Sequence, residues 1–212
     1  MEWQVSAEDE VVMAEPPYDF TRSPRRDVTE REPEWRSLSH LSQVELRLAR
    51  VHLGLERADD YDGPRRALLV GENPGPHTHA DTPLFPWPES SSAGRLMAMS
   101  ELTPGQYLGC LYRRNLADVE WSKREARARA RRIVTALFDS PKDLRVVLCG
   151  AKVGRAFQLS VEFWEVTRLV SGQMAVVIPH PSGKNLLYND QWNRERTGRW
   201  MRWAALGEDV PE

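Results

Sequence analysis

The body of the chain alternates short apolar runs with longer stretches whose apolar residues recur at helical spacing. Continuous apolar runs bounded by turn residues are typical of strands buried on both faces. Four such strands are predicted, at 67–70, within 107–116, at 145–149 and at 174–178. Helices are predicted at about 93–101, 122–138, 151–159 and 190–206. This alternation predicts a three-layer α/β/α fold with a short, mainly parallel four-stranded sheet.

Two of the predicted helices carry further signals. Ser122 has Glu125 three residues on, the spacing of a capping box, and the helix that follows has Ala126, Ile133 and Leu137 on one stripe. In the last helix Trp192, Trp200 and Trp203 fall near one stripe. Tryptophans at this spacing favour the core over base-stacking platforms.

The first 63 residues differ from the body. Residues 1–36 are rich in Pro, Asp, Glu and Arg, which predicts an extended or partly disordered arm. Apolar residues at helical spacing predict one helix at about 41–56, and the turn cluster at 59–64 marks a boundary. We therefore divide the chain into an acidic N-terminal extension (1–63) and an α/β domain (64–212).

Charge is distributed unevenly over these two parts. The whole chain has a net charge of -2. Residues 1–63 carry 15 acidic and 8 basic residues, a net charge of −7, whereas residues 64–212 carry 16 acidic and 21 basic residues, a net charge of +5. The overall charge argues against a nucleic-acid partner, but the basic body is compatible with one.

The composition excludes several classes of protein. Cys110 and Cys149 are the two cysteines of the chain, too few for a disulfide scaffold, a four-thiolate iron–sulfur cluster or a zinc site made of cysteines alone. No apolar run reaches the roughly 18–20 residues that span a bilayer, and the acidic N-terminus lacks the pattern of a secretory signal. We expect a cytoplasmic monomer without a membrane partner.

Two polar loops follow the first and the last predicted strands. Gly71–Pro76 reads GENPGP, and His180–Asn185 reads HPSGKN, with Asn73 and His180 separated by 107 positions. In open α/β sheets, ligands bind at the carboxyl ends of the strands. We therefore expect both loops to line one functional site.

This pair of motifs resembles the two signature motifs of the uracil-DNA glycosylase superfamily, and GENPGP is closest to its single-strand-selective and mismatch-specific branches. The resemblance covers about residues 66–206. It implies the fold of that superfamily and a monofunctional DNA glycosylase of base-excision repair, which hydrolyses the N-glycosidic bond of a flipped uracil or modified pyrimidine. The partner would be single- or double-stranded DNA, and no metal or other cofactor would be needed.

The resemblance also gives individual residues a role. Asn73 would hold the attacking water, with Glu72 as the alternative, and His180 would stabilise the leaving base by a hydrogen bond. Phe85 would stack on the base and Asn115 would read its edge. The other residues expected around the base are Gly71, Pro74, Gly75, His77 and His79. The residues expected to contact DNA are Ser182, Gly183, Lys184, Asn185, Arg113 and Arg114.

Two other functions stay open at this point. The same scaffold could bind a modified base or a nucleotide without cleaving it. A metal-dependent hydrolase could use His77, His79 and Asp81, because a His-x-His-x-Asp run offers metal-ligating side chains. That run lacks the histidine expected after the aspartate, since Thr82 stands there.

Overall fold

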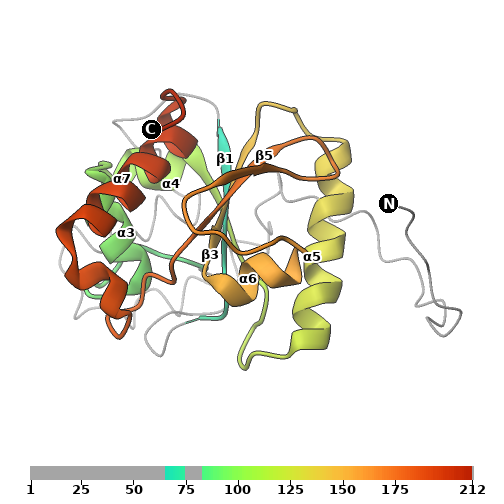
Figure 1. Cartoon of the computed structure of the whole chain (residues 1–212), viewed down its shortest axis with the longest axis horizontal. Coiled ribbons are helices and arrows are strands. Elements are labelled where there is room, and N and C mark those ends of the chain that lie inside the picture. The colour runs from blue at the N-terminus through green and yellow to red at the C-terminus, as the bar shows by residue number, and fades with distance from the viewer. Residues whose placement is uncertain (1–64, 75–82, 212) are drawn as a thin grey trace, which may run out of the picture.

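A computed structural model describes residues 65–74 and 83–211 of the chain. The N-terminal extension and its expected helix at 41–56 lie outside these residues. The described residues form an α/β fold around one mixed five-stranded sheet with the order β2-β1-β3-β5-β4 (Figure 1). The strands are β1 (Ala67–Gly71), β2 (Leu111–Asn115), β3 (Arg145–Cys149), β4 (Val166–Arg168) and β5 (Met174–Ile178).

Five α-helices and a short 3-10 helix are present in the described part of the chain. They are α3 (Ser92–Ser100), α4 (Pro104–Cys110), α5 (Lys123–Phe138), α6 (Ala151–Ala156), η2 (Leu186–Asn189) and α7 (Gln191–Leu206). Helices α3, α4 and α7 cover one face of the sheet, and α5 and α6 cover the other (Figure 1). The predicted three layers are confirmed.

Strand β1 shows why the apolar runs are continuous. Ala67 and Leu69 pack into the core on the side of α3, α4 and α7, whereas Leu68 and Val70 pack into the core on the side of α5 and α6. All four side chains are completely buried. A strand covered on both faces needs apolar residues at every position, so the usual alternation with polar residues is missing.

The prediction of four strands is wrong, because the sheet formed by the described residues has five. Strand β4 pairs antiparallel with β5 at the edge of the sheet, and the chain turns between the two strands at Gly172, whose φ is +100°. The strand is three residues long, and each of its residues is at least partly exposed. A short edge strand of this kind has no continuous apolar run, so the pattern search missed it.

The second predicted strand is only partly extended. Residues up to Cys110 belong to α4, and the strand begins at Leu111. A capping box starts this helix: the Thr103 side chain accepts a hydrogen bond from the Gln106 N–H, and the Gln106 side chain accepts one from the Thr103 N–H. Pro104 occupies the first turn, where it disturbs no helical hydrogen bond. These local signals outweigh the apolar run that favoured a strand.

The expectations for the two long helices are largely confirmed. Ser122 caps α5 by accepting a hydrogen bond from the Glu125 N–H, and the predicted stripe of α5 is buried. In α7, Trp200 and Trp203 are buried in the core, whereas Trp192 is 56% exposed. The core interpretation therefore holds for two of the three tryptophans.

Helices α3 and α7 cross at Gly198. A Cβ added to Gly198 would lie 2.0 Å from the carbonyl oxygen of Met99, near the end of α3. A contact this short is impossible for a real side chain, so glycine is needed for the close approach of the two helices. The crossing also matters for the loops that precede α3 and α7, because these loops meet at the pocket described below.

Replacing this glycine should destabilise the fold. We expect Gly198→Ala to lower the free energy of unfolding by about 1–3 kcal/mol, the usual cost of overpacking a core. Helix propensity alone would change the stability in the opposite direction, by about 1 kcal/mol. Urea unfolding of the two proteins measures the difference, and a variant more stable than wild type would contradict the close crossing.

Candidate active site

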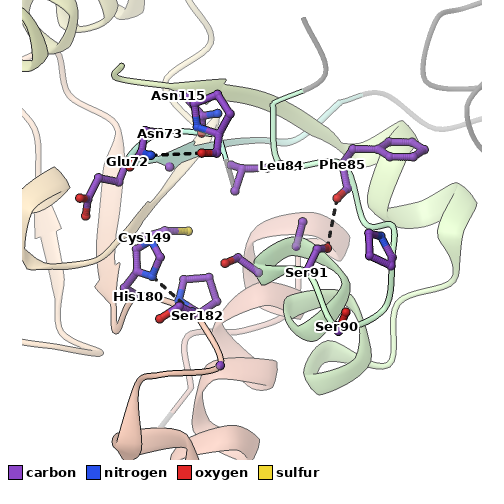
Figure 2. A pocket seen from close by; sticks show the side chains of 17 residues that line it. Glu72, Asn73, Leu84, Phe85, Ser90, Ser91, Asn115, Cys149, His180 and Ser182 are labelled. Carbon is purple, nitrogen blue, oxygen red and sulfur yellow. Dashed lines mark hydrogen bonds between the residues drawn. The ribbon is translucent and has the colours of Figure 1, made fainter. Parts of the chain in front are cut away.

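A pocket of about 340 Å³ lies at the edge of the sheet where the parallel strands end (Figure 2). Gly71 ends β1, Asn115 ends β2, Cys149 ends β3, and His180 follows β5 by two residues. The remaining lining comes from the loops after β1 and β5 and from the start of α3. These residues are Glu72, Asn73, Pro74, Leu84, Phe85, Pro88, Ser90, Ser91, Ser92, Ala93, Pro181, Ser182 and Gly183.

The pocket brings together most of the residues predicted from the sequence. The predicted residues that line it are Gly71, Glu72, Asn73, Pro74, Phe85, Asn115, His180, Ser182 and Gly183. Gly75, His77 and His79 lie outside the described residues, as does Asp81, so the alternative metal site stays untested. Lys184, Asn185, Arg113 and Arg114 are described but do not line the pocket.

Asn73 is held by two backbone carbonyls. Its Nδ2 donates to the carbonyl oxygen of Pro74 at 3.1 Å and to that of Val119 at 3.4 Å. Both bonds use the nitrogen, so the side-chain oxygen Oδ1 makes no hydrogen bond within the described part of the chain. Asn73 therefore offers an acceptor, and an acceptor is what a bound water needs from this side chain.

Glu72 is paired with a lysine that the sequence analysis did not single out. The Nζ of Lys152, in α6, lies 2.5 Å from Oε1 of Glu72. The Glu72 side chain is 15% exposed and the Lys152 side chain 55% exposed. Lys152 also lies 5.7 Å from the centre of the Trp121 ring, on the loop between β2 and α5. The carboxylate at the pocket is thus compensated by a cation from helix α6.

The second motif fixes the tautomer of His180. The backbone N–H of Ser182 donates to Nδ1 of His180 at 3.2 Å (Figure 2). Since Nδ1 accepts, the proton of the neutral ring sits on Nε2. Burial lowers the pKa of His180, and Lys152 lowers it further, while Glu72 opposes both. At neutral pH the ring is therefore uncharged and has a single N–H donor.

The loop that carries His180 is held from several sides. Asn185 Nδ2 donates to the His180 carbonyl oxygen at 2.8 Å, and the buried Tyr188 hydroxyl donates to the Pro179 carbonyl oxygen at 2.7 Å. Gly150 has a φ of +103°, and a Cβ added to it would lie 3.2 Å from Cβ of His180. Asn185, predicted to contact DNA, thus supports the backbone of the histidine.

Asn115 has an unsatisfied acceptor. Its Oδ1 is buried and has no hydrogen-bond partner among the described residues. The oxygen packs against Gly71, where an added Cβ would lie 2.5 Å away, so glycine leaves the room that the amide needs. A buried acceptor without a partner is costly. A ligand that donates an N–H at this point would remove that cost.

Phe85 lies at the pocket, but its ring does not face the polar groups. Figure 2 shows the ring turned away from Asn115 and His180, with the Leu84 side chain nearer to them. Leu84 adopts a left-handed backbone with a φ of 51°, and it packs against Gly71. The Tyr107 hydroxyl donates a hydrogen bond to the Leu84 carbonyl oxygen at 3.3 Å. In this arrangement the apolar wall beside Asn115 is Leu84, which the sequence analysis missed.

The expected phosphate contact of Arg113 is wrong for this structure. Arg113 is 6% exposed, and its Nη1 donates to the carbonyl oxygens of Tyr107 and Leu108 at 3.3 Å each. It thus supports the end of α4 from inside the protein, and burial lowers its pKa to about 10. The neighbouring Arg114 donates to the Arg113 carbonyl at 2.8 Å, and Lys184 is exposed beyond the pocket.

Cys149 and three serines are further lining residues that the sequence analysis missed. The Cys149 thiol is buried, and burial raises its pKa. A thiol that stays protonated at neutral pH is a poor nucleophile, so the pocket does not favour cysteine chemistry. Ser91 accepts a hydrogen bond from the Gly94 N–H at 3.0 Å and caps α3. Ser90 and Ser92 add hydroxyl groups on the same side of the pocket.

Comparison of the chain with protein-family models and with curated proteins finds no match. Within residues 65–74 and 83–211, none of the helices combines the length and the apolar character that a membrane crossing requires. The assignment of a function therefore depends on the motifs and on the geometry of the pocket.

The lowered pKa of His180 should appear in the pH dependence of stability. In the unfolded chain a histidine takes up its proton near pH 6.5, above the pKa of His180 in the folded protein. Stability should therefore fall as the pH drops from about 6.5 through this lower pKa. Thermal unfolding between about pH 7.5 and 5 should show a larger loss for wild type than for His180→Gln. The other histidines occur in both proteins and cancel, so equal losses would show that His180 is not buried as described.

Proposed function

We propose that the protein is a monofunctional DNA glycosylase, which hydrolyses the N-glycosidic bond of a flipped uracil or modified pyrimidine. The observation that carries the proposal is the hydrogen bond from the Ser182 N–H to Nδ1 of His180. It leaves a neutral Nε2–H donor in the same pocket as Asn73, whose Oδ1 accepts no hydrogen bond from the described residues. Cleavage of this bond needs a donor at the leaving base and an acceptor at the attacking water.

The chemistry divides between these two residues. As the bond breaks, the sugar gains oxocarbenium character and the base leaves with negative charge on a carbonyl oxygen. A preorganised donor aimed at that oxygen stabilises the developing charge, and His180 is the donor. Asn73 Oδ1 accepts a hydrogen bond from the water that adds to the sugar carbon, and the proton that this water loses ends on the departing base anion. Glu72 is the alternative for this step, but its carboxylate is already engaged in the ion pair with Lys152, so Asn73 is favoured.

Asn115 supports recognition of a base with an N–H on its pairing edge. A uracil-type ring carries such an N–H beside a carbonyl, and the unsatisfied Oδ1 of Asn115 is an acceptor for it. Cytosine has no hydrogen on the corresponding ring nitrogen. The pocket thus favours uracil and related modified pyrimidines over cytosine, because the wrong base leaves the buried acceptor unpaired.

Access to the pocket requires that the nucleotide leaves the base stack. Leu186 and Leu187 follow the second motif directly and are 76% and 42% exposed. Exposed apolar side chains beside a base pocket can enter the gap that a flipped base leaves. Lys184, next to them, supplies a positive charge for the DNA backbone. The net charge of +5 over residues 64–212 is consistent with this partner.

A second candidate is a protein that binds a modified base without cleaving it. The ion pair of Glu72 with Lys152 favours it, because the pairing ties up one of the two groups that could hold a water. Binding alone would need Asn115 and the apolar wall but not the acceptor of Asn73. Substitution of Asn73 therefore separates the two functions.

Single-turnover assays on oligonucleotides with uracil, mismatched or 5-substituted pyrimidines test the proposal, with cytosine as the control base. We expect Asn73→Ala to slow base release by about 10²-fold, the cost of a misplaced reacting group. We expect His180→Ala to slow it by about 10²–10³-fold, the range for a lost donor to developing charge. DNA binding by Asn73→Ala should change much less than its rate. Tight, specific binding with no base release by wild type would instead support the second candidate.

A further inference from the structure

Lys152 belongs to neither motif and does not line the pocket, yet it contacts the pocket's only described carboxylate. Among the described lining residues, Glu72 is the one with a carboxyl group. The Lys152 ammonium lies 2.5 Å from it. A lysine that is 55% exposed would usually point into water. The Lys152 side chain instead extends from α6 towards Glu72, the residue that directly follows β1.

The local backbone brings Lys152 to this place. The positive φ of Gly150 ends β3 with a sharp turn, and α6 begins at the next residue. The same turn packs Gly150 against His180. On its other side, the Lys152 ammonium lies over the Trp121 ring, an arrangement that attracts a cation to an aromatic face. Lys152 therefore joins the loops after β1, β2 and β3 and lies near the loop after β5.

The charge of Glu72 would otherwise oppose the proposed reaction. The base leaves as an anion, and the Glu72 side chain is 15% exposed, so water screens its carboxylate only in part. An uncompensated carboxylate at the pocket would repel the leaving base. It would also favour a charged His180, whose second ring proton conflicts with the hydrogen bond donated by the Ser182 N–H. A cation beside Glu72 removes both effects.

Among the described residues, few charged groups lie around His180. Glu72 and Lys152 act on it electrostatically, and Arg95 of α3 lies behind Gly183, its Nη1 3.3 Å from where a glycine Cβ would be. The Cys149 thiol in the same pocket is neutral, because burial raises its pKa. Within the part of the chain that the structure describes, the balance between the carboxylate of Glu72 and the ammonium of Lys152 is thus the main local charge that substitution can change.

From this geometry we propose that Lys152 is a positioning residue of the site: its ammonium neutralises and orients Glu72, so that the pocket holds a neutral His180 and tolerates an anionic leaving base. The inference rests on the proposed glycosylase function. It assigns Lys152 no contact with the substrate, and its action passes through Glu72.

The test compares Lys152→Met with Lys152→Arg and with Lys142→Met. Lys142 is a matched control away from the pocket, because its ammonium also lies near an aromatic ring, that of Phe138, and donates hydrogen bonds. We expect Lys152→Met to lower kcat about tenfold, less than the roughly 10²-fold cost of a 1 Å misplacement at the reacting groups. KM should change by less than about twofold. Lys152→Arg should retain most of kcat, and Lys142→Met should match wild type.

A double-mutant cycle isolates the route through Glu72. In the Glu72→Gln background no carboxylate needs to be neutralised, so Lys152→Met should cause no further loss of kcat. An equal tenfold loss in both backgrounds would overturn the inference, since Lys152 would then act independently of Glu72. Unchanged kcat in Lys152→Met would overturn it as well.

A second readout does not depend on activity. NMR titration of the His180 ring in the full chain should give a higher pKa in Lys152→Met than in wild type, because Glu72 is then unopposed, and a lower pKa in Glu72→Gln. Identical titration in all three proteins overturns the inference even if DNA is cleaved. If wild type releases no base from any oligonucleotide, the proposed function fails, and the titration still decides whether Lys152 controls the charge at His180.

Discussion

Parallel pairing of four strands places the whole candidate site at one edge of the sheet. Gly71 pairs with Asn115, and Cys149 pairs with Ile178, so the ends of neighbouring strands lie side by side. Both faces of β1, β3 and β5 are buried, and a shift in their register by one residue would exchange every side chain between the two cores. The positions of the strand ends are therefore fixed by packing. Loops separated by more than a hundred residues meet in one pocket as a consequence.

Backbone groups then decide which polar atom each side chain presents to the pocket. Two backbone carbonyl oxygens accept hydrogen bonds from Nδ2 of Asn73, so its side-chain oxygen is left as the acceptor. The backbone N–H of Ser182 donates to Nδ1 of His180, so Nε2 carries the ring proton and is left as the donor. Asn115 presents an acceptor that has no partner among the described residues, in space that Gly71 leaves open. Under the proposed function, the Asn73 oxygen would accept from the water and the His180 Nε2–H would donate to the leaving base, and ordinary loop hydrogen bonds set both of these groups.

The sequence predicted those parts of the fold and site that depend on local pattern. Continuous apolar strands, the capped helix α5 and the two motif loops are all visible in short segments. Strand β4 was missed because an exposed edge strand of three residues leaves no pattern. Lys152 and Cys149 were missed because their place at the site depends on strand order. The burial of Arg113 could have been predicted from its position in the strand. Arg113 lies two residues after the buried Leu111 in β2, so both side chains face the same core.

Mass spectrometry of the reaction products tests the proposed hydrolytic release of a pyrimidine base from DNA. An oligonucleotide with a single uracil or 5-substituted pyrimidine is incubated with the wild-type chain. We expect a free base together with a strand that has lost the base and gained a hydroxyl group from water at the sugar. An unchanged strand for every pyrimidine tested, or a strand cut without release of the base, would contradict it.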